Sequence, residues 1–333
     1  MTRRATFFLL AAGALLAGCM AMGGGTYLAR AAWSETRILL RREPIEDILA
    51  RPDVDATHAE RLRLALAVRE FARDQLGLRV GDSYSSFVDI DGTAPVHVLS
   101  AAYRDRLEAY EWRYPIVGRL PYRGFFDRGA ADAAAARLEA EGLDVEIRPA
   151  AAFSTLGWFA DPLLSSTAEE PPVGLAETII HELFHATIWR GGDPAFNEST
   201  ANWAGHRGAI AFFCSAGPGA DETHCREARR RWEETRARGR IFARLAARLH
   251  RLYAAAPPAS ERERVRARLA ARAGAALEAQ GIGRSTELSP PNNARLLGLQ
   301  LYTTGLEELD RTVPPGGDLR TALKALAGSA EGG

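Results

Sequence analysis

The chain has 333 residues, of which 42 are Lys or Arg and 42 are Asp or Glu, so its formal net charge is zero. A nucleic-acid-binding protein needs a basic surface that displaces counterions, and this charge balance argues against a nucleic-acid partner. Hydrophobic residues make up 47% of the chain, which excludes a disordered polymer and suffices for a buried core.

The first residues have the pattern of an export signal. Arg3 and Arg4 form a short basic start, and residues 6–17 are apolar but too short for a stable transmembrane span. Leu16-Ala17-Gly18-Cys19 then resembles a bacterial lipobox, in which small residues precede a cysteine that carries diacylglycerol. The alternative is an ordinary cleaved signal with a cysteine there by chance.

The lipobox sets the expected domain plan and location. Residues 1–18 are the expected lipoprotein signal peptide, Cys19 the lipidated first residue, and residues 19–26 a flexible tether. Residues 27–333 then form a single domain of two lobes. Because Met20 is not Asp, retention in the inner membrane is not indicated, and we expect a periplasm-facing protein anchored to the outer membrane of a bacterial cell envelope.

Helical and alternating apolar patterns predict a small mixed α/β lobe in the first half of this domain. Its predicted elements are two helices within residues 27–49, a helix over 58–76, strands over 96–99, 109–117 and 145–147, a helix over 128–141, and a further strand over 155–164.

The second half of the domain is predicted to be helical, with proline near helix starts and glycine after helix ends. The predicted helices cover residues 172–189, 193 to about 213, 221–253, 261–280 and 292–309. The whole domain is therefore expected to be α+β and mostly helical, with a small mixed α/β lobe and a helical catalytic and C-terminal lobe. The catalytic helices are expected at about residues 171–213.

The main chemical signal is the hexapeptide Ile180-His181-Glu182-Leu183-Phe184-His185. His181 and His185 are four residues apart, so on a helix they lie on one face about 5–6 Å apart, and both imidazoles can bind one Zn²⁺ ion. Glu182 lies beside them and can reach a water at the metal without ligating the metal, which suits a general base. The alternative is a surface helix with two histidines on its wet face, which the apolar flanking residues disfavour.

A catalytic zinc site uses three protein ligands and keeps one position open. Glu198, in the next predicted helix, is the candidate third ligand, because the short turn through Gly191-Gly192 makes the two helices antiparallel. His206 is the competing ligand, two turns further along. Glu198 can also be an acid that merely favours the positive end of a helix dipole.

Cys214 and Cys225 are the other two cysteines, and the residues between them are rich in Gly and Pro. A disulfide can persist in the oxidising periplasm, and the intervening segment can turn back on itself. The two alternatives are a disulfide and a pair of buried free thiols.

Several stretches together resemble one family: the putative bacterial aminopeptidases with a lipoprotein signal, a branch of the glutamate-zincin metallopeptidases. The matching stretches are Leu16-Ala17-Gly18-Cys19, Glu43-Pro44-Ile45, residues 153–165, residues 181–187, Phe196-Asn197-Glu198, and Asn292-Asn293-Ala294 followed by Tyr302. The resemblance implies a zincin-like fold, one Zn²⁺ on His181, His185 and Glu198, and peptide hydrolysis with Glu182 as the base.

Two further roles follow from such a mechanism. The oxyanion of the tetrahedral intermediate needs a donor besides zinc, for which Tyr302 is the candidate, with a core tyrosine as the alternative. An aminopeptidase needs a carboxylate for the substrate ammonium group, for which Glu169, Glu170 and Glu177 are candidates. The predicted strand at residues 155–160 is expected to pair with the substrate backbone.

The sequence therefore predicts a lipid-anchored zinc peptidase that hydrolyses peptides, acting as an aminopeptidase. One alternative is an endopeptidase that acts on envelope proteins. Another is a zinc-stabilised scaffold or chaperone lipoprotein without hydrolytic activity, which the presence of Glu182 disfavours.

Overall fold

The computed structural model describes residues 40–90, 96–114, 118–125, 127–150, 160–217, 219–313 and 317–331. Glu43–Gly333 form one compact unit, and Met1–Arg42 form a separate one. The expected signal peptide, Cys19, the tether and most of the first helix predicted within residues 27–49 lie outside the described residues.

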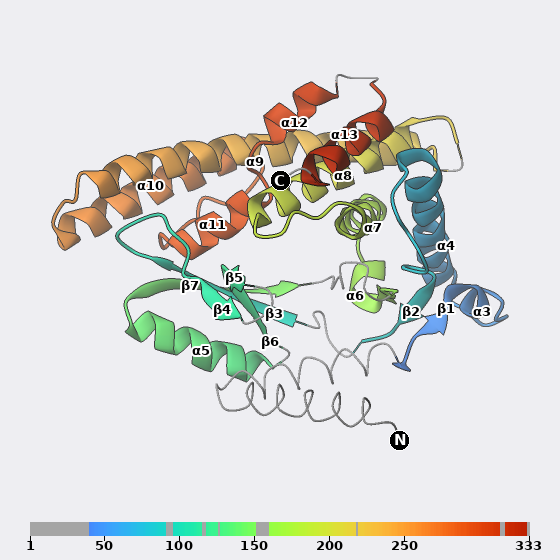
Figure 1. Cartoon of the computed structure of the whole chain (residues 1–333), viewed down its shortest axis with the longest axis horizontal. Helices are drawn as coiled ribbons and strands as arrows, with labels where there is room; N and C mark the ends of the chain where they lie inside the picture. Colours follow the sequence, from blue (N-terminus) through green and yellow to red (C-terminus); the bar gives the residue numbers. More distant parts are fainter. Residues whose placement is uncertain are drawn as a thin grey trace, which may run out of the picture. The chain divides into compact units, whose positions relative to one another are not determined.

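The described part of the chain is mostly helical with small sheets, as the sequence predicts (Figure 1). The first half contains the helices α3 (Ile45–Leu49), α4 (Ala56–Phe71), which continues into a π-helical turn to Leu76, α5 (Arg128–Ala140) and α6 (Ser165–Ala168). The second half contains α7 (Pro172–Thr187), α8 (Pro194–Cys214), α9 (Glu222–Ala254), α10 (Ala259–Ala279), α11 (Asn293–Leu301), α12 (Leu306–Thr312) and α13 (Leu319–Glu331).

The described residues form three small sheets beside the helices. In the first, β2 (Ser86–Val88) pairs antiparallel with β1 (Glu43–Pro44) and parallel with β8 (Leu163–Leu164). In the second, β3 (Val96–Tyr103) lies between β6 (Tyr122–Phe125) and β7 (Leu143–Ala150), all antiparallel. In the third, β4 (Trp112–Tyr114) pairs antiparallel with β5 (Gly118–Leu120).

The sheet β6-β3-β7 lies between α5 and α11 (Figure 1). Side chains alternate between the two faces of a strand, and the face toward α5 is apolar, with Leu99, Phe125 and Leu143 packed against α5. The opposite face of β7 carries Asp144, Glu146 and Arg148. This polar face binds α11, which places the end of α11 beside the helical lobe.

Helix α7 is at the centre of the main hydrophobic core, where it packs against α4 and α8. Its buried apolar side chains are Val173, Leu175, Ala176, Ile179, Ile180, Leu183 and Phe184. Since these cover most of the helix circumference, His181, Glu182 and His185 occupy a narrow polar ridge. Helix α7 is therefore held rigidly from several sides.

Two glycines of α8 allow it to approach α7 closely. A Cβ at Gly205 would lie 2.7 Å from the backbone oxygen of Glu177, and a Cβ at Gly208 would lie 2.8 Å from Ile180 Cδ1. Side chains at these positions would force the helices apart. The absence of a side chain at Gly205 and Gly208 therefore permits the close packing of α8 on α7.

A disulfide links the end of α8 to the start of α9, joining Cys214 to Cys225. The loop between them ends at Asp221, whose side chain caps α9 by accepting a hydrogen bond from the backbone N–H of His224. The disulfide and the helix cap thus both fix the connection between α8 and α9.

The second-half helices agree with the sequence prediction except at the C-terminal end. A single helix over residues 292–309 is wrong, because α11 ends at Leu301 and α12 begins after Gly305, which has a φ of 71°. The apolar pattern runs through this break because Leu306 is also buried. Helix α13, which follows, was not predicted.

The strand predictions were less accurate. Of the predicted strand 109–117, Trp112–Tyr114 forms a strand, Ala109 makes one isolated bridge to Ala102, and residues 115–117 lie outside the described residues. Of the predicted strand 155–164, residues 155–159 lie outside the described residues and β8 includes only Leu163–Leu164. The strands β1, β2 and β6 were not predicted, since each has four residues or fewer.

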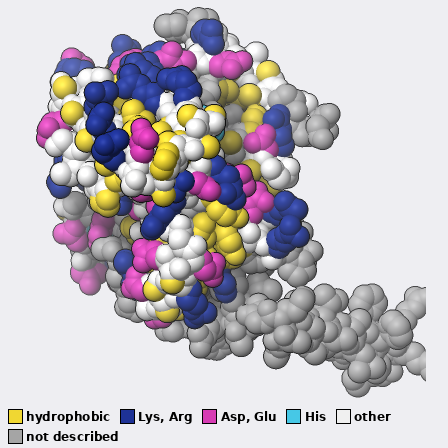
Figure 2. Space-filling view, turned by 90° about the vertical axis from the view of Figure 1, so that its left-hand side faces the viewer, with side chains coloured by type: hydrophobic (Ala, Val, Ile, Leu, Met, Phe, Trp, Pro, Cys, Tyr) yellow, Lys and Arg dark blue, Asp and Glu magenta, His cyan; other side chains and the backbone are white. Residues whose placement is uncertain are grey.

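The exterior carries both signs of charge. Figure 2 shows Arg side chains intermingled with Asp and Glu side chains over the face in view. Within the described residues, no helix is both long enough and apolar enough to cross a membrane.

Candidate metal centre

The turn between α7 and α8 positions the candidate ligands. Gly192 adopts a φ of 77°, a conformation that glycine accepts without strain. Asp193 caps α8 by accepting from the backbone N–H of Phe196 at 3.0 Å, and Pro194 occupies the first turn. The buried Asn197 accepts from the backbone N–H of Arg190 and donates to its carbonyl, both at 2.8 Å. These bonds fix the backbone immediately before Glu198.

His181, His185 and Glu198 converge on one point. Nε2 of His181 lies 3.0 Å from Nε2 of His185, and Oε2 of Glu198 lies 3.5 Å and 3.8 Å from these two atoms. The three residues can each offer one ligand atom within 4.8 Å of the others. The side chains of His181 and Glu198 are each 15% exposed, so solvent reaches the cluster.

The donor set fits a zinc ion. Ligands bound to one tetrahedral Zn²⁺ at its usual bond lengths lie about 3.3 Å apart, which is the range these three atoms already occupy. Two imidazole nitrogens and one carboxylate oxygen also form a known set for a catalytic zinc site. His181, His185 and Glu198 would therefore hold the ion.

The charges within the cluster favour ionised forms. Burial raises the pKa of Glu198, but the hydrogen bonds and charges of His181 and His185 outweigh it and hold the pKa well below its usual range. Burial likewise lowers the pKa of His181, but the bond to Glu198 and the charges of Glu182 and Glu198 raise it overall. The electrostatics of the cluster thus favour positive charge at this point despite the cost of burial.

Glu182 lies on α7 next to this cluster and is partly exposed. Its charge helps to raise the pKa of two neighbouring phenols, those of Tyr84 and Tyr302, for both of which burial is the larger cause. The carboxylate is therefore close enough to both hydroxyls to act on them electrostatically.

Tyr302 joins the site from the C-terminal end of α11, directly after Leu301. Its ring stacks on that of His181, with centroids 6.1 Å apart and planes at 28°. Its backbone carbonyl accepts a hydrogen bond from Asn202 Nδ2 at 2.7 Å, and its hydroxyl accepts one from Arg148 Nη2 at 3.3 Å. Burial first, and then the charge of Glu198, raise the pKa of this hydroxyl.

Sequence reasoning missed Asn202, Arg148 and Tyr122. Asn202 follows Glu198 by one helical turn, and this spacing could have placed both on one face. Burial, followed by the charge of Glu198, raises the pKa of Tyr122, while the charge of Arg148 lowers it, so Tyr122 also borders the site. Arg148 and Tyr122 come from different strands, and no local sequence signal could have paired them with α8.

The structure puts His206 in a different cluster. Its Nδ1 lies 2.7 Å from Glu177 Oε1 and its Nε2 lies 3.1 Å from the hydroxyl of Thr235. Arg231 donates to the other oxygen of Glu177 from Nε at 2.9 Å. His206 is therefore engaged behind α7 and does not join the candidate ligands.

The same contacts bear on the candidates for binding a substrate ammonium group. Glu177 is occupied by His206 and Arg231. Glu170 accepts from the hydroxyl of Thr178 at 3.2 Å, and burial raises its pKa. Glu169 is exposed. Among the described contacts, none joins these three carboxylates to the candidate metal ligands.

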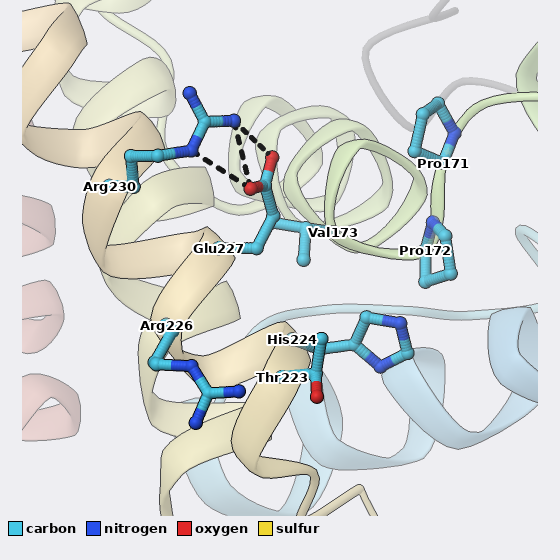
Figure 3. Close-up of a pocket in the computed structure, with 8 residues that line it drawn as sticks. All are labelled: Pro171, Pro172, Val173, Thr223, His224, Arg226, Glu227 and Arg230. Carbon is cyan, nitrogen blue, oxygen red and sulfur yellow. Dashed lines mark hydrogen bonds and ion pairs between the residues drawn. The ribbon is translucent and has the colours of Figure 1, made fainter.

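A surface hollow of about 390 Å³ lies away from this cluster (Figure 3). It is lined by Pro171, Pro172, Val173, Thr223, His224, Arg226, Glu227 and Arg230. Val173 precedes His181 by eight residues, which corresponds to about 12 Å along the helix. The charges of Glu227 and Arg230 pair with each other, as Figure 3 shows, so they offer no unpaired group to a ligand.

A comparison with known protein families gave a match. A family model described as "Putative aminopeptidase" matches residues 26–324. No curated protein and no solved structure gave a match. The matched residues include α7, α8, the sheet that carries Arg148, and α11 with Tyr302 after its end. Because it extends over most of the chain, the protein belongs to the putative aminopeptidase family.

Proposed function

We propose that this protein is a zinc-dependent peptidase that acts as an aminopeptidase, with a zincin-like catalytic core and a lipid anchor. The observation that carries the proposal is the convergence of His181, His185 and Glu198 next to Glu182. Membership of a family described by aminopeptidase activity supports peptides as the substrate class. A purely structural metal site would have no use for a base at Glu182.

When bound, zinc would polarise the scissile carbonyl and make a water molecule acidic enough to attack it. Glu182 accepts the proton of this water and delivers it to the leaving amine, so that the amine departs neutral. Tyr302 donates its hydroxyl proton in a hydrogen bond to the oxygen on which negative charge develops. Asn202 and His181 hold the tyrosine in place for this role.

The lipobox supports a site of action in the bacterial cell envelope. Acylation of Cys19 would tether the domain to the outer membrane on its periplasmic side. The disulfide between Cys214 and Cys225 suits that oxidising compartment. Peptides of the periplasm would then be the available substrates.

The Glu182→Gln variant tests this proposal. Glutamine keeps the size of the side chain but cannot accept the proton, so bound zinc should stay near one equivalent while turnover falls by about 10²–10⁴-fold. Metal content and hydrolysis of a peptide library would be measured in parallel. The matched control is Glu139→Gln, which changes an exposed carboxylate on α5 and should alter neither quantity.

The outcomes separate the alternatives. Zinc retained and activity lost supports the hydrolase, whereas loss of zinc means that Glu182 ligates or orders the site. Zinc retained without hydrolysis by the wild type would favour a zinc-stabilised scaffold. Equal cleavage of free-amine and N-acetylated peptides would favour an endopeptidase acting on envelope proteins.

A further inference from the structure

On the face of β7 toward α11, all charged side chains but one form ion pairs within the described residues. Asp144 binds Arg266 and accepts from the backbone N–H of Asn293. Glu146 binds Arg295 at 3.0 Å. Arg148, the next residue on this face, contacts Tyr302 and has no carboxylate partner among the described residues. Residues 151–159, which follow β7 in the sequence, contain no acidic residue.

This unpaired guanidinium lies beside the candidate metal centre. Its central carbon is 5.1 Å from the ring centroid of Tyr302, which in turn stacks on His181. Tyr122 pairs with Ser100 on β3, and Arg148 pairs with Val98, two residues earlier, so Tyr122 and Arg148 share one face of the sheet. Arg148 thus lies on the same sheet face as Tyr122 and contacts Tyr302, the ring that stacks on His181.

A partly buried arginine is stabilised when an anion binds it, because burial removes water from the guanidinium without replacing its hydrogen bonds. The flat guanidinium group matches a carboxylate with two parallel hydrogen bonds. No carboxylate of the described residues fills this role, so the guanidinium of Arg148 is available to an anion from outside the described residues.

We infer that Arg148 binds the free C-terminal carboxylate of the substrate, so that the protein acts on short peptides. This inference rests on the proposed peptidase function. A carboxylate one or two residues beyond the scissile bond lies within about 7 Å of it, and only the ring of Tyr302 links Arg148 to His181 among the described contacts. A long polypeptide has no carboxylate at this distance and forgoes the interaction.

The test compares leucyl-glycine with leucyl-glycine amide, which lacks the carboxylate charge, in the full-length protein. The wild type should have a KM about 10- to 100-fold lower for the free acid, the range expected for a charge-assisted hydrogen bond. Arg148→Gln should raise KM for the free acid by that factor and change it for the amide by less than about threefold. Arg148→Lys, which keeps the charge, should recover part of the preference.

The controls make each outcome decisive. Arg119→Gln alters an exposed arginine on β5 and should preserve the preference. If Arg148→Gln does not fold, as judged by thermal unfolding, the lysine variant alone decides. Equal KM values for acid and amide in the wild type would overturn the inference, as would an equal loss of kcat for both substrates in Arg148→Gln. The latter would mean that Arg148 acts through Tyr302.

Failure of the proposed function gives a different result. If neither peptide is hydrolysed, binding of both peptides to the Glu182→Gln protein is measured by calorimetry. Leucyl-glycine that binds more tightly than its amide, with this difference lost when Arg148→Gln is added to Glu182→Gln, supports carboxylate binding by Arg148 even without hydrolysis. Equal binding of acid and amide would overturn it.

Discussion

Glu198 decides whether the two histidines form part of a complete metal site. Its carboxylate supplies the third donor within 3.8 Å of both imidazoles, whereas His206 is bound to Glu177 and Thr235. We expect Glu198→Ala to lose most bound zinc, because two ligands from one helix hold an ion weakly. Zinc content by atomic spectroscopy measures this.

The matched variant is His206→Ala, which should keep zinc near one equivalent. Because zinc bound by the folded state stabilises it, only Glu198→Ala should also abolish the rise in thermal unfolding temperature on zinc addition. Full zinc occupancy in Glu198→Ala with loss in His206→Ala would transfer the ligand role to His206.

The buried carboxylate of Glu177 should make the free energy of unfolding of the protein depend on pH. Burial raises its pKa, but the hydrogen bond and charge of His206 and the contacts with Arg231 outweigh burial, so the folded pKa lies below the ordinary value of 4.5. The stabilisation from its charged form is therefore fully present above that value and is lost as pH falls through the folded pKa. Urea unfolding at a series of pH values from neutral to acidic measures it.

The Glu177→Gln variant should be less stable at neutral pH by about 1–3 kcal/mol, since Arg231 and His206 lose a charged partner. Its free energy of unfolding should also fall less steeply with acidification than that of the wild type. The exposed Glu139→Gln change serves as the control. Parallel pH profiles for wild type and Glu177→Gln would contradict the assignment.

At the residue scale, sequence spacing predicted what lies close in the chain. His181, Glu182 and His185 are on one helix and Glu198 follows a short turn, so helical geometry alone could bring them together. Arg148 could not be predicted, because its position depends on the pairing of β3 with β7 and on the docking of α11. Such contacts join residues far apart in sequence, and local patterns do not encode them.

At the scale of helices, the contact between α7 and α8 depends on Gly205. A Cβ there would lie 2.7 Å from the backbone oxygen of Glu177, and backbone cannot move aside as a side-chain end can. We expect Gly205→Ala to lower the free energy of unfolding by about 1–3 kcal/mol through overpacking. Because the strain falls one turn from His181, zinc affinity should fall as well.

Gly298→Ala is the control for this change. Gly298 lies within α11, and a Cβ there would have no atom within 4 Å. Alanine in a helix interior is favoured over glycine by about 0.5–1 kcal/mol, so this variant should be as stable as the wild type or more so. Equal stability of Gly205→Ala and the wild type in denaturant unfolding would show that the helices can separate at low cost.

Element prediction succeeded where helices were long and capped. The segment at residues 194–214 was predicted closely because Asp193 caps it and Pro194 starts it. The segment after Asn292 was not, because apolar residues with helical spacing continue through the turn at Gly305. Hydrophobic periodicity reports which residues are buried and not whether the backbone is continuous between them.

At the scale of the whole molecule, the lipid anchor is the main prediction that remains to be tested. Cys19→Ser removes the thiol that would carry diacylglycerol, so the precursor should remain uncleaved and associated with the membrane. Its size on a gel and its fractionation between membrane and soluble fractions measure this. Normal cleavage and release of the Cys19→Ser protein would contradict a lipoprotein signal and favour an ordinary one.

The overall class of the fold followed from composition and periodicity, which gave a mostly helical protein with a small α/β part. The packing of α11 against the sheet β6-β3-β7 could not be predicted from composition and periodicity. Asn292 and Asn293 show the reason, since their side chains bind the backbone carbonyls of Val145 and Tyr103 across the sheet. In the sequence, only the resemblance to a family singles out these asparagines. In the structure they hold α11, and with it Tyr302, against the sheet.

The late position of Tyr302 has a consequence for how the protein matures. A chain that is synthesised from its N-terminus contains His181, His185 and Glu198 well before α11 has emerged. Such a partial chain can gather its metal ligands, but it lacks the donor that we propose for the reacting oxygen. Hydrolysis would then begin only after the C-terminal helices have docked. An incompletely synthesised chain would therefore not cleave its own unfolded segments.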